Sequence, residues 1–551
     1  MQKIVLSRQH IEALNRRRRV IVNLDTNWGI PGFEDHDAED IINFNMEFFT
    51  GLEGSQVDSI WWAWGDMNYG PWPSKILPVH HGYQKWLKSG VDPLPIGIRE
   101  GRKRGLEAFY TFRINSGMDV TGEYDDPLFI GGSLVLKEDP DWGFLSPVPS
   151  WRFRTFNFAI KEARDYKLSI IKEVAENHDF DGIEIDWRCG AINFPDVMHA
   201  WEHRDYLTEF MRSARMMLLD VAKRKGKPIL LAARVPENIE GCHYDGLDVE
   251  RWVEENLIDI LALGCHNFEV DIEAFRMLTC GKEIKLYPST DDHHSSSGYE
   301  HPPIEVFRGV FANFWHQGAD GMYTFNFYPL PYERPLPSDW LSPRNKIWDV
   351  HRQAYCEMGS LETLRFKDKV FVTQRRGGGQ CPPVAELFYV NSNCFAQLPK
   401  ELSNDENDET YIHIPVGEDV NKYKDQIKSI ELRVLLSDPE AVNLPEDGRI
   451  YSGPVGIGTD EVYVSATGKW VRELAEPPGK GIENNLRTRI NGVILERPSI
   501  REGWLVYGLK PNQLALGKNV AGFKLKGREP RKQQNMTLEK LEIHVTYIKG
   551  S

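Results

Sequence analysis

Eight short apolar runs recur through the first two thirds of the chain and constrain its fold more than any other feature. The runs span residues 19–28, 57–66, 106–115, 181–188, 228–235, 258–266, 284–289 and 321–327. Stretches with apolar residues at helical spacing lie between them, as at 165–177, 203–223 and 306–317. Helix and strand in alternation predict parallel βα units, and this number of units predicts an α/β fold of the (β/α)8 TIM-barrel type. An open doubly wound sheet is the alternative, disfavoured because no GxGxxG motif follows the first run.

A different pattern begins after Trp348, where the helical periodicity fades. Alternating strand patterns follow at 429–434, 486–495, 503–507 and 541–547, and the pair Asn491-Gly492 is a strong hairpin signal. A chain of 551 residues is also too long for one compact core. We therefore predict a TIM-barrel catalytic domain over residues 1–355 and an all-β sandwich, jelly-roll-like, over residues 356–551. Packing or oligomer contact is the favoured role of the second domain, with sugar binding as the alternative.

Charge and hydropathy bear on the partners. The formal net charge of −15 argues against nucleic acid. No apolar run approaches the ~18 residues of a membrane helix, so no membrane partner is expected. Residues 1–20 lack the apolar core of a signal peptide, and the run Arg16–Arg19 is interpreted as a solvated helix end.

The seven cysteines are scattered and include no CxxC pair, so neither a structural zinc site nor a disulfide framework is expected. Reduced thiols fit a cytoplasmic or periplasmic protein, or a secreted one if a signal peptide has been removed.

The fourth run, from Asp181 to Arg188, delivers two carboxylates to one place. Because strand side chains alternate between faces, Glu184 and Asp186 point the same way, roughly 6–7 Å apart. Gly182 and Arg188 share that face. Two carboxylates side by side are costly to bury unless they are paired or used in chemistry. The pair therefore indicates an acid/base site at the end of a barrel strand, with a structural ion-paired cluster as the alternative.

Polar residues follow the apolar part of each run, and the carboxyl ends of barrel strands converge on the face where active sites form. Tryptophan among these residues gives a polar pocket with aromatic walls, which suits a sugar ring. The predicted substrate-binding residues are Asp25, Asn27, Trp28, Trp64, Asp66, Arg113, Asn115, Arg188, Arg234, Glu237, His266, Asn267, His293 and Asn326.

Glycoside hydrolysis needs two carboxyl groups, one of which protonates the leaving oxygen and has a raised pKa. Repulsion between Glu184 and Asp186 would raise the pKa of one of them. Asp186, nearer the predicted mouth, is the first choice for the acid, and Glu184 would orient it or hold a substrate hydroxyl. Asp291, Asp292 or Glu237 could be the opposing group.

Three arginines, Arg113, Arg188 and Arg234, approach the same mouth. They either neutralise carboxylates or grip an anionic sugar, such as a uronate or a sulfated residue. His266, His293 and His294 could join the carboxylates in a metal site, but no compact ligand spacing supports it. We therefore expect no cofactor and no metal.

Two family resemblances follow from these motifs. The stretch Asp181–Trp187 is similar to the strand-four signature of family 18 chitinases, D-G-x-D-x-D-x-E, except that Arg188 stands where that family has its catalytic Glu. Residues 105–115, 157–159, 181–187 and 318–327 resemble the glycosyl hydrolase-like TIM-barrel proteins of environmental bacteria. That resemblance implies carbohydrate chemistry and leaves the substrate open.

On the pattern of retaining clan A glycosidases, the acid/base follows strand four and the nucleophile lies on strand seven. The resemblance then implies Asp186 or Glu184 as the acid and Asp291 or Asp292 as its partner, although those enzymes usually carry Glu in both places.

The sequence thus predicts a glycoside hydrolase that acts on an oligo- or polysaccharide, as a monomer or a homo-oligomer. A non-catalytic carbohydrate-binding protein, suggested by Arg188, and a metal-dependent sugar isomerase or hydrolase are the alternatives.

Overall fold

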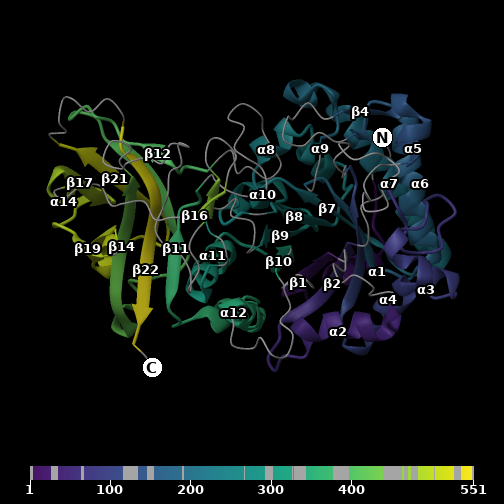
Figure 1. Ribbon diagram of the computed structural model, residues 1–551, viewed down its shortest axis with the longest axis horizontal. Helices are drawn as coiled ribbons and strands as arrows, with labels where there is room; N and C mark the ends of the chain where they lie inside the picture. Colours follow the sequence, from purple (N-terminus) through teal and green to yellow (C-terminus); the bar gives the residue numbers. More distant parts are fainter. Residues whose placement is uncertain are drawn as a thin grey trace. The chain divides into compact units, whose positions relative to one another are not determined.

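The computed structural model describes residues 4–25, 35–63, 68–115, 134–145, 154–188, 192–265, 267–291, 299, 302–325, 327, 343–375, 396–437, 462–464, 470–472, 482–501, 503–526 and 535–548 (Figure 1). The chain divides into two compact units. The first comprises residues 1–265, 270–290 and 319–334, and the second comprises residues 266–269, 291–318 and 335–551. The domain boundary predicted at residue 355 stays a prediction.

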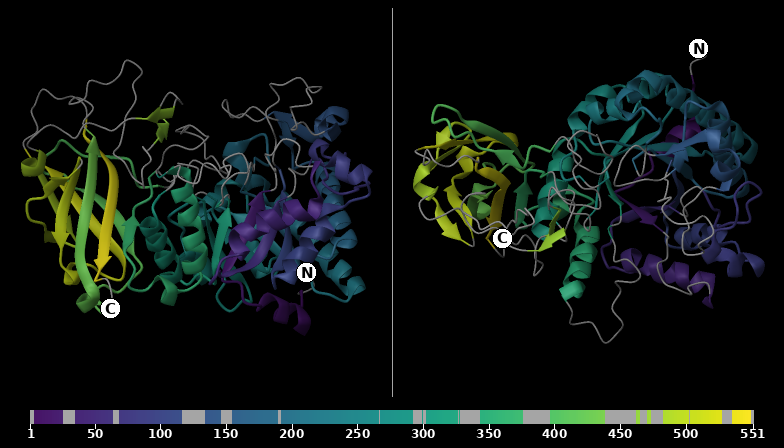
Figure 2. Two further views of the ribbon diagram at one scale, coloured as in Figure 1. Left: turned by 60° about the horizontal axis from the view of Figure 1, so that its bottom comes forward. Right: turned by 45° about the horizontal axis from the view of Figure 1, so that its top comes forward.

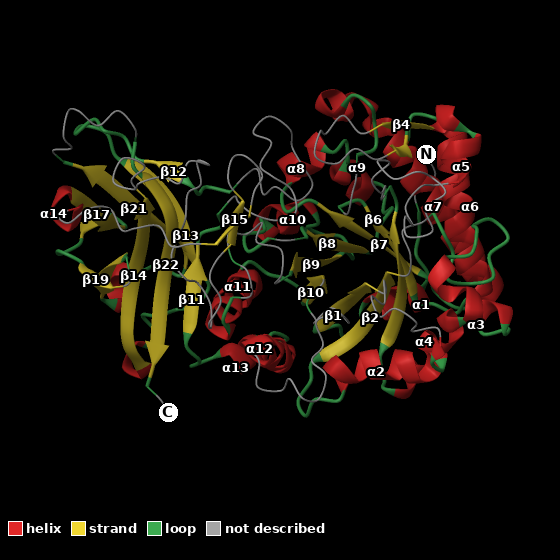
Figure 3. Ribbon diagram, in the orientation of Figure 1, coloured by secondary structure: helices red, strands yellow, loops and turns green. Residues whose placement is uncertain are grey.

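The first unit is built on a closed barrel of parallel strands in the order β1-β10-β9-β8-β7-β6-β3-β2, drawn in yellow in Figure 3. The strands are β1 (Val20–Asp25), β2 (Val57–Ala63), β3 (Glu107–Arg113), β6 (Gly182–Asp186), β7 (Leu230–Val235), β8 (Ile260–Leu263), β9 (Lys285–Thr290) and β10 (Met322–Phe325). Each of the eight predicted runs overlaps one of these strands, so the TIM-barrel prediction is confirmed.

Helices of the first unit lie around the outside of its strands (Figure 2). They are α1 (Arg8–Leu14), α2 (Ala38–Thr50), α3 (Gln84–Lys88), α4 (Pro93–Lys103), α5 (Leu134–Glu138), α6 (Lys161–Asn177), α7 (Arg204–Lys225), α8 (Ile239–Tyr244), α9 (Val249–Glu254) and α10 (Ile272–Leu278), and a short ladder joins β4 (Gly143–Leu145) to β5 (Arg154–Phe156). Aspartate side chains accept backbone N–H bonds at helix starts, as Asp37 does for α2. The helices predicted at 165–177 and 203–223 are α6 and α7.

Aromatic side chains fill the amino half of the barrel. Trp61 stacks on Phe109 with ring centroids 4.4 Å apart and meets Tyr323 edge-on at 5.3 Å. Gly182 of β6 makes this packing possible, because a Cβ there would lie 2.1 Å from the Phe109 ring. The glycine of the Asp-Gly motif is therefore a packing requirement of the barrel interior.

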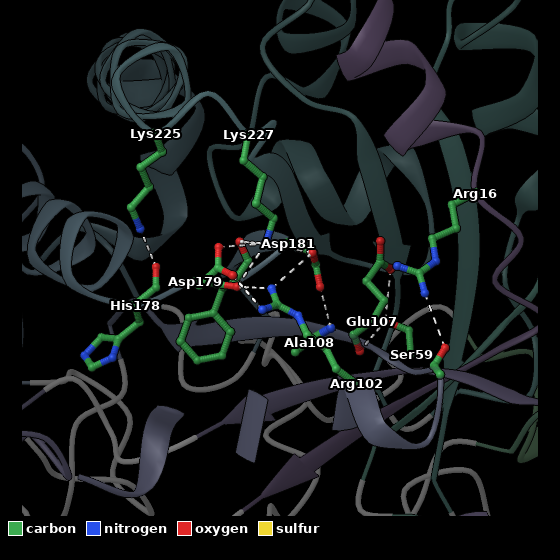
Figure 4. Close-up of polar contacts among 12 residues, drawn as sticks. Arg16, Ser59, Arg102, Glu107, Ala108, His178, Asp179, Asp181, Lys225 and Lys227 are labelled. Carbon is green, nitrogen blue, oxygen red and sulfur yellow. Dashed lines mark hydrogen bonds and ion pairs between the residues drawn. The ribbon is translucent and has the colours of Figure 1, made fainter. Parts of the chain in front are cut away.

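The aspartate of that motif also has a structural role (Figure 4). Asp181 accepts a 3.0 Å hydrogen bond from the backbone N–H of Ala108 and forms a 2.9 Å ion pair with Lys227. Arg102 and Lys227 both pair with the neighbouring Asp179. This cluster joins the amino ends of β3 and β6, where barrels are stabilised rather than catalytic.

The run Arg16–Arg19 follows the end of α1 at Leu14 and is not uniformly solvated. Arg18 is 2% exposed, and its guanidinium donates hydrogen bonds of 2.5 and 2.7 Å to the carboxylate of Glu107. The interpretation as a solvated helix end is wrong for this arginine, since barrel closure buries Glu107 and requires a counter-charge.

Among its described residues, the second unit contains two larger antiparallel sheets and a two-stranded ladder. One has the order β11-β22-β14-β20-β19, from β11 (Lys369–Val372), β22 (Thr537–Tyr547), β14 (Ile427–Ser437), β20 (Trp504–Leu509) and β19 (Ser499–Arg501), with β12 (Lys400–Glu401) also on β22. The other has the order β13-β21-β17-β18, from β13 (Thr410–Val416), β21 (Gly517–Leu525), β17 (Leu486–Ile490) and β18 (Val493–Ile494). A separate ladder pairs β15 (Val462–Val464) with β16 (Trp470–Arg472). The helices of this unit are α11 (Ile304–His316), α12 (Pro343–Glu357), α13 (Leu361–Leu364) and α14 (Ile482–Asn485).

The predicted β domain after the barrel is confirmed, while its jelly-roll connectivity stays a prediction. Thr488 of one sheet and Tyr507 of the other share a 2.8 Å hydrogen bond. The predicted hairpin lies between β17 and β18, with Asn491 at φ 49° and Gly492 at φ 82°. Two consecutive positive φ values are what a type I′ turn requires. The part of the chain that the structure describes holds no helix of the length and apolarity needed to span a bilayer.

Candidate active site

Glu184 lies inside the barrel at the middle of β6 and is fully buried. Its Oε2 accepts hydrogen bonds from the hydroxyls of Thr111 (2.7 Å) and Tyr323 (2.9 Å). The side-chain amide of Asn23 donates to the same Tyr323 oxygen at 2.6 Å and lies 3.5 Å from Oε2. Three other barrel strands, β1, β3 and β10, therefore fix one carboxylate oxygen of Glu184.

The second oxygen of Glu184, Oε1, has no hydrogen-bond partner among the described residues. Burial raises the pKa of Glu184 to about 7, with the Arg234 charge opposing the rise and the Asp186 charge adding to it. Burial therefore favours the protonated form of Glu184 more than in an exposed glutamate. Because Oε2 already accepts two hydroxyl hydrogens, the proton of the neutral form belongs on Oε1.

Asp186, the last residue of β6, has a contrasting environment. It is fully buried in a two-point ion pair with Arg234 of β7, which includes a 2.9 Å bond from Nε to Oδ1. The backbone N–H of Arg188 donates to the same Oδ1 at 2.9 Å. The Arg234 guanidinium also lies 4.0 Å from the ring centroid of Phe325. The strand pairing places Asp186 beside Arg234. Glu184 and Asp186 stand two positions apart on β6 and share one face, as predicted, but they have different partners.

A second charged cluster follows β6 and β7. Arg188 forms a 3.0 Å ion pair with Glu237, and both side chains are less than a tenth exposed. Burial raises the pKa of the nearby Asp245 to about 7, while the Arg188 charge opposes the rise. Arg188 and Arg234 thus each hold a carboxylate, which is the first of the two roles that the sequence allowed for them.

Two other predicted residues have clear positions. Arg113, at the end of β3, is 8% exposed and its guanidinium lies 5.5 Å from the Phe325 ring centroid. The side-chain amide of Asn115 forms hydrogen bonds with backbone groups. Its Nδ2 donates to the carbonyls of Phe156 and Ile192, and its Oδ1 accepts from the N–H of Phe156. Asn115 therefore holds the segments after β3 and β6 together, and its role in substrate binding stays a prediction.

The remaining predictions concern other parts of the chain. Asp291 and Asn267 are buried and belong to the second unit. The side chain of Asp25 lies outside the described residues, as do Asn27, Trp28, Trp64, Asp66, His266, Asp292, His293, His294 and Asn326. Among the described residues, no group of three His, Cys, Asp or Glu side chains could hold a metal ion.

The prediction did not include Asn23, Thr111 and Tyr323, the three residues that hold Glu184. Asn23 and Thr111 each stand two positions before a predicted site residue, Asp25 and Arg113, and so share its face of the strand. The alternation rule could have found these two, because a polar residue on the inward face of an otherwise apolar strand needs a polar partner.

No protein-family model matches the chain. A segment of 134 residues, 23% of the chain, is 27% identical to the glycosyl hydrolase YngK of Bacillus subtilis (strain 168). The match spans 24% of that relative, so the chain covers about a quarter of its length. The predicted resemblance to glycosyl hydrolase-like proteins is confirmed at this level.

Similar solved structures include the PgaB (BpsB) glycoside hydrolase domain of Bordetella bronchiseptica, at 12% identity and a TM-score of 0.38, covering 61% of this chain and 99% of that one. They also include α-L-fucosidase isoenzyme 2 of Paenibacillus thiaminolyticus, at 11% identity and a TM-score of 0.41, covering 97% and 100%. TM-scores of this size do not establish a common fold.

Proposed function

We propose that the protein is a glycoside hydrolase and that Glu184 supplies the acid. One observation carries the proposal: two carboxylates on one barrel strand have opposite environments, Asp186 in an ion pair and Glu184 with a pKa of about 7 and an unpartnered oxygen. Two titratable groups whose surroundings differ in this way are typical of acid/base pairs. The similarity to a protein named glycosyl hydrolase supports the same reaction class.

In the proposed reaction, the proton on Oε1 of Glu184 moves to the leaving glycosidic oxygen as the bond from that oxygen to the anomeric carbon breaks. The oxygen of a water molecule then binds the anomeric carbon, and its released proton restores Glu184. Asp186 remains paired with Arg234 throughout. The sequence favoured Asp186 as the acid, and the ion pair leads us to propose Glu184 instead.

The opposing carboxyl group and the charge of the sugar are finer proposals. Asp291, Asp292 and Glu237 stay the options for the opposing group, with Glu237 already bound to Arg188. An anionic sugar stays a proposal drawn from the sequence, and Arg188 and Arg234 each already hold a carboxylate. Equal cleavage of neutral and acidic oligosaccharides would contradict it.

The test is hydrolysis of neutral, uronate-containing and sulfated oligosaccharides by wild type and by Glu184→Gln. Glu173→Gln is the matched control, because Glu173 is a buried glutamate of α6 that accepts bonds from Trp72 and Lys75 and has no place in the site. We expect Glu184→Gln to lower kcat by roughly a thousandfold or more. We expect the control to keep wild-type kcat.

A second variant keeps the test decisive if Glu184→Gln does not fold. Tyr323→Phe removes a hydrogen bond that stabilises the ionised form of Glu184, so the pKa of Glu184 should rise. The pH optimum of hydrolysis should move upward with it. Unchanged activity in Glu184→Gln, or an unmoved pH profile in Tyr323→Phe, would refute the assignment. Sugar binding without cleavage by the wild type would favour the non-catalytic alternative.

A further inference from the structure

Two segments that follow barrel strands in the sequence belong to the second unit. Residues 266–269 come soon after β8, and residues 291–318 come directly after β9. The carboxyl ends of barrel strands are where site-forming loops begin. Asn267 and Asp291, two residues that the sequence predicted to be functional, therefore belong to the second unit.

Gln374, two residues beyond β11, holds the first of these segments. Its side-chain Oε1 accepts hydrogen bonds from the backbone N–H groups of Phe268 (2.8 Å) and Glu269 (2.7 Å). Its own backbone N–H donates to Oε1 of Glu269 at 3.0 Å. Gln374 is 3% exposed and Phe268 is 2% exposed, so these bonds are shielded from water. One glutamine thus fixes the backbone at two consecutive residues of the segment.

Tyr299, in the second segment, contacts β22. The hydroxyl of Tyr299 donates to Glu542 at 2.9 Å, and the ammonium group of Lys540 lies 3.8 Å from the centre of the Tyr299 ring. Tyr299, Lys540 and Glu542 are all buried. The rings of Phe268 and Tyr299 have centroids 5.8 Å apart, which links the two segments to each other.

Helix α11, which completes the second segment, packs on β11 with no side chain between them at one point. A Cβ on Gly309 of α11 would lie 2.1 Å from the carbonyl oxygen of Val370. Asn313 of the same helix accepts a 2.6 Å hydrogen bond from the N–H of Gly417. Contacts this close leave the helix one position relative to the sheet.

We propose that the C-terminal β domain is a positioning domain, with Gln374 as the positioning residue for segment 267–269. This inference rests on the proposed function, because Asn267 was predicted to bind the sugar substrate. The sequence favoured packing or oligomer contact as the role of the β domain, and the proposal gives the domain the role of positioning segment 267–269.

The test compares Gln374→Met with Tyr507→Phe in the full-length protein. Methionine keeps the volume of Gln374 and cannot accept the two backbone bonds. Tyr507→Phe is the matched control, because it removes a buried hydrogen bond to Thr488 in the same domain, away from the segment. Hydrogen exchange by mass spectrometry follows the amides of Phe268 and Glu269. The values of kcat and KM are measured with the oligosaccharide that the wild type cleaves fastest among the neutral, uronate-containing and sulfated ones.

We expect Gln374→Met to speed exchange at Phe268 and Glu269 by about tenfold or more and to lower kcat/KM by a similar factor. The control should leave both quantities at wild-type values. Unchanged exchange in Gln374→Met would overturn the positioning role. Faster exchange with unchanged kcat/KM would show that the segment is held for another reason and would also overturn it. If wild type cleaves nothing, the proposed function fails, and the exchange result alone decides whether Gln374 holds the segment.

Discussion

His178, the residue between α6 and β6, gives the stability of the protein a calculable dependence on pH. It is 6% exposed, and neither ring nitrogen has a hydrogen-bond partner among the described residues. Burial lowers the pKa of His178 to about 4 from its ordinary 6.5, and the nearby charge of Lys225 adds to the effect. Asp92, 3.9 Å away, provides little counter-charge at pH 5, because burial raises its pKa to about 6.

The sign follows from the lowered pKa. Well above pH 6.5 His178 is neutral in both the folded and the unfolded state and adds no pH dependence. As the pH falls towards 4, the unfolded chain binds a proton that the folded protein does not, so the folded state loses stability. With these two pKa values the loss is about 2 kcal/mol at pH 5 and approaches ~3 kcal/mol below pH 4.

The perturbation is His178→Phe. The ring keeps its edge contacts with Trp72 and Phe180, and no hydrogen bond is lost. We expect the variant to match wild type near pH 7.5 and to be more stable by about 2 kcal/mol near pH 5. Urea denaturation of both proteins at both pH values measures this, and the difference between them cancels other titrating groups. A stability difference that is the same at the two pH values would refute the reasoning.

Two further predictions concern packing and charge. Glu107→Gln should lower stability by roughly 3–5 kcal/mol, because it leaves the buried guanidinium of Arg18 without its carboxylate. Urea denaturation tests this, and replacing both partners with apolar residues should restore most of the loss. Gly309→Ala should lower stability by about 1–3 kcal/mol, because the new Cβ must displace the Val370 backbone. Calorimetry should show a lower Tm than for Gly508→Ala, a control position with open space around its Cβ.

The strands of the barrel were predictable because each needs only a local apolar run. The shared face of Glu184 and Asp186 was predictable for the same reason, since alternation along a strand is local. Their different environments were not, because these depend on which residues neighbouring strands bring alongside. Asp186 meets Arg234 through the register between β6 and β7, and no pattern in the sequence states that register.

The sequence also provided no means to predict that residues 266–269 and 291–318 belong to the second unit. Gln374 and Phe268 are 106 positions apart, and neither belongs to a motif. A buried glutamine that binds backbone groups leaves no mark on hydrophobic periodicity. The solvated interpretation of Arg18 was wrong for a related reason: an arginine run looks polar until one of its members meets a buried carboxylate.

The hydrogen bond between Tyr299 and Glu542 cannot form until late in the synthesis of the chain. The two residues are separated by 243 positions, so a ribosome that adds roughly 5–20 residues per second completes Glu542 about 12–50 s after Tyr299. Throughout that interval Tyr299 lacks its partners in β22, because those residues have not yet been synthesised. We expect a nascent chain stalled before β22 to expose Tyr299 to chaperones and proteases. Early termination would therefore damage the centre of the molecule as well as its end.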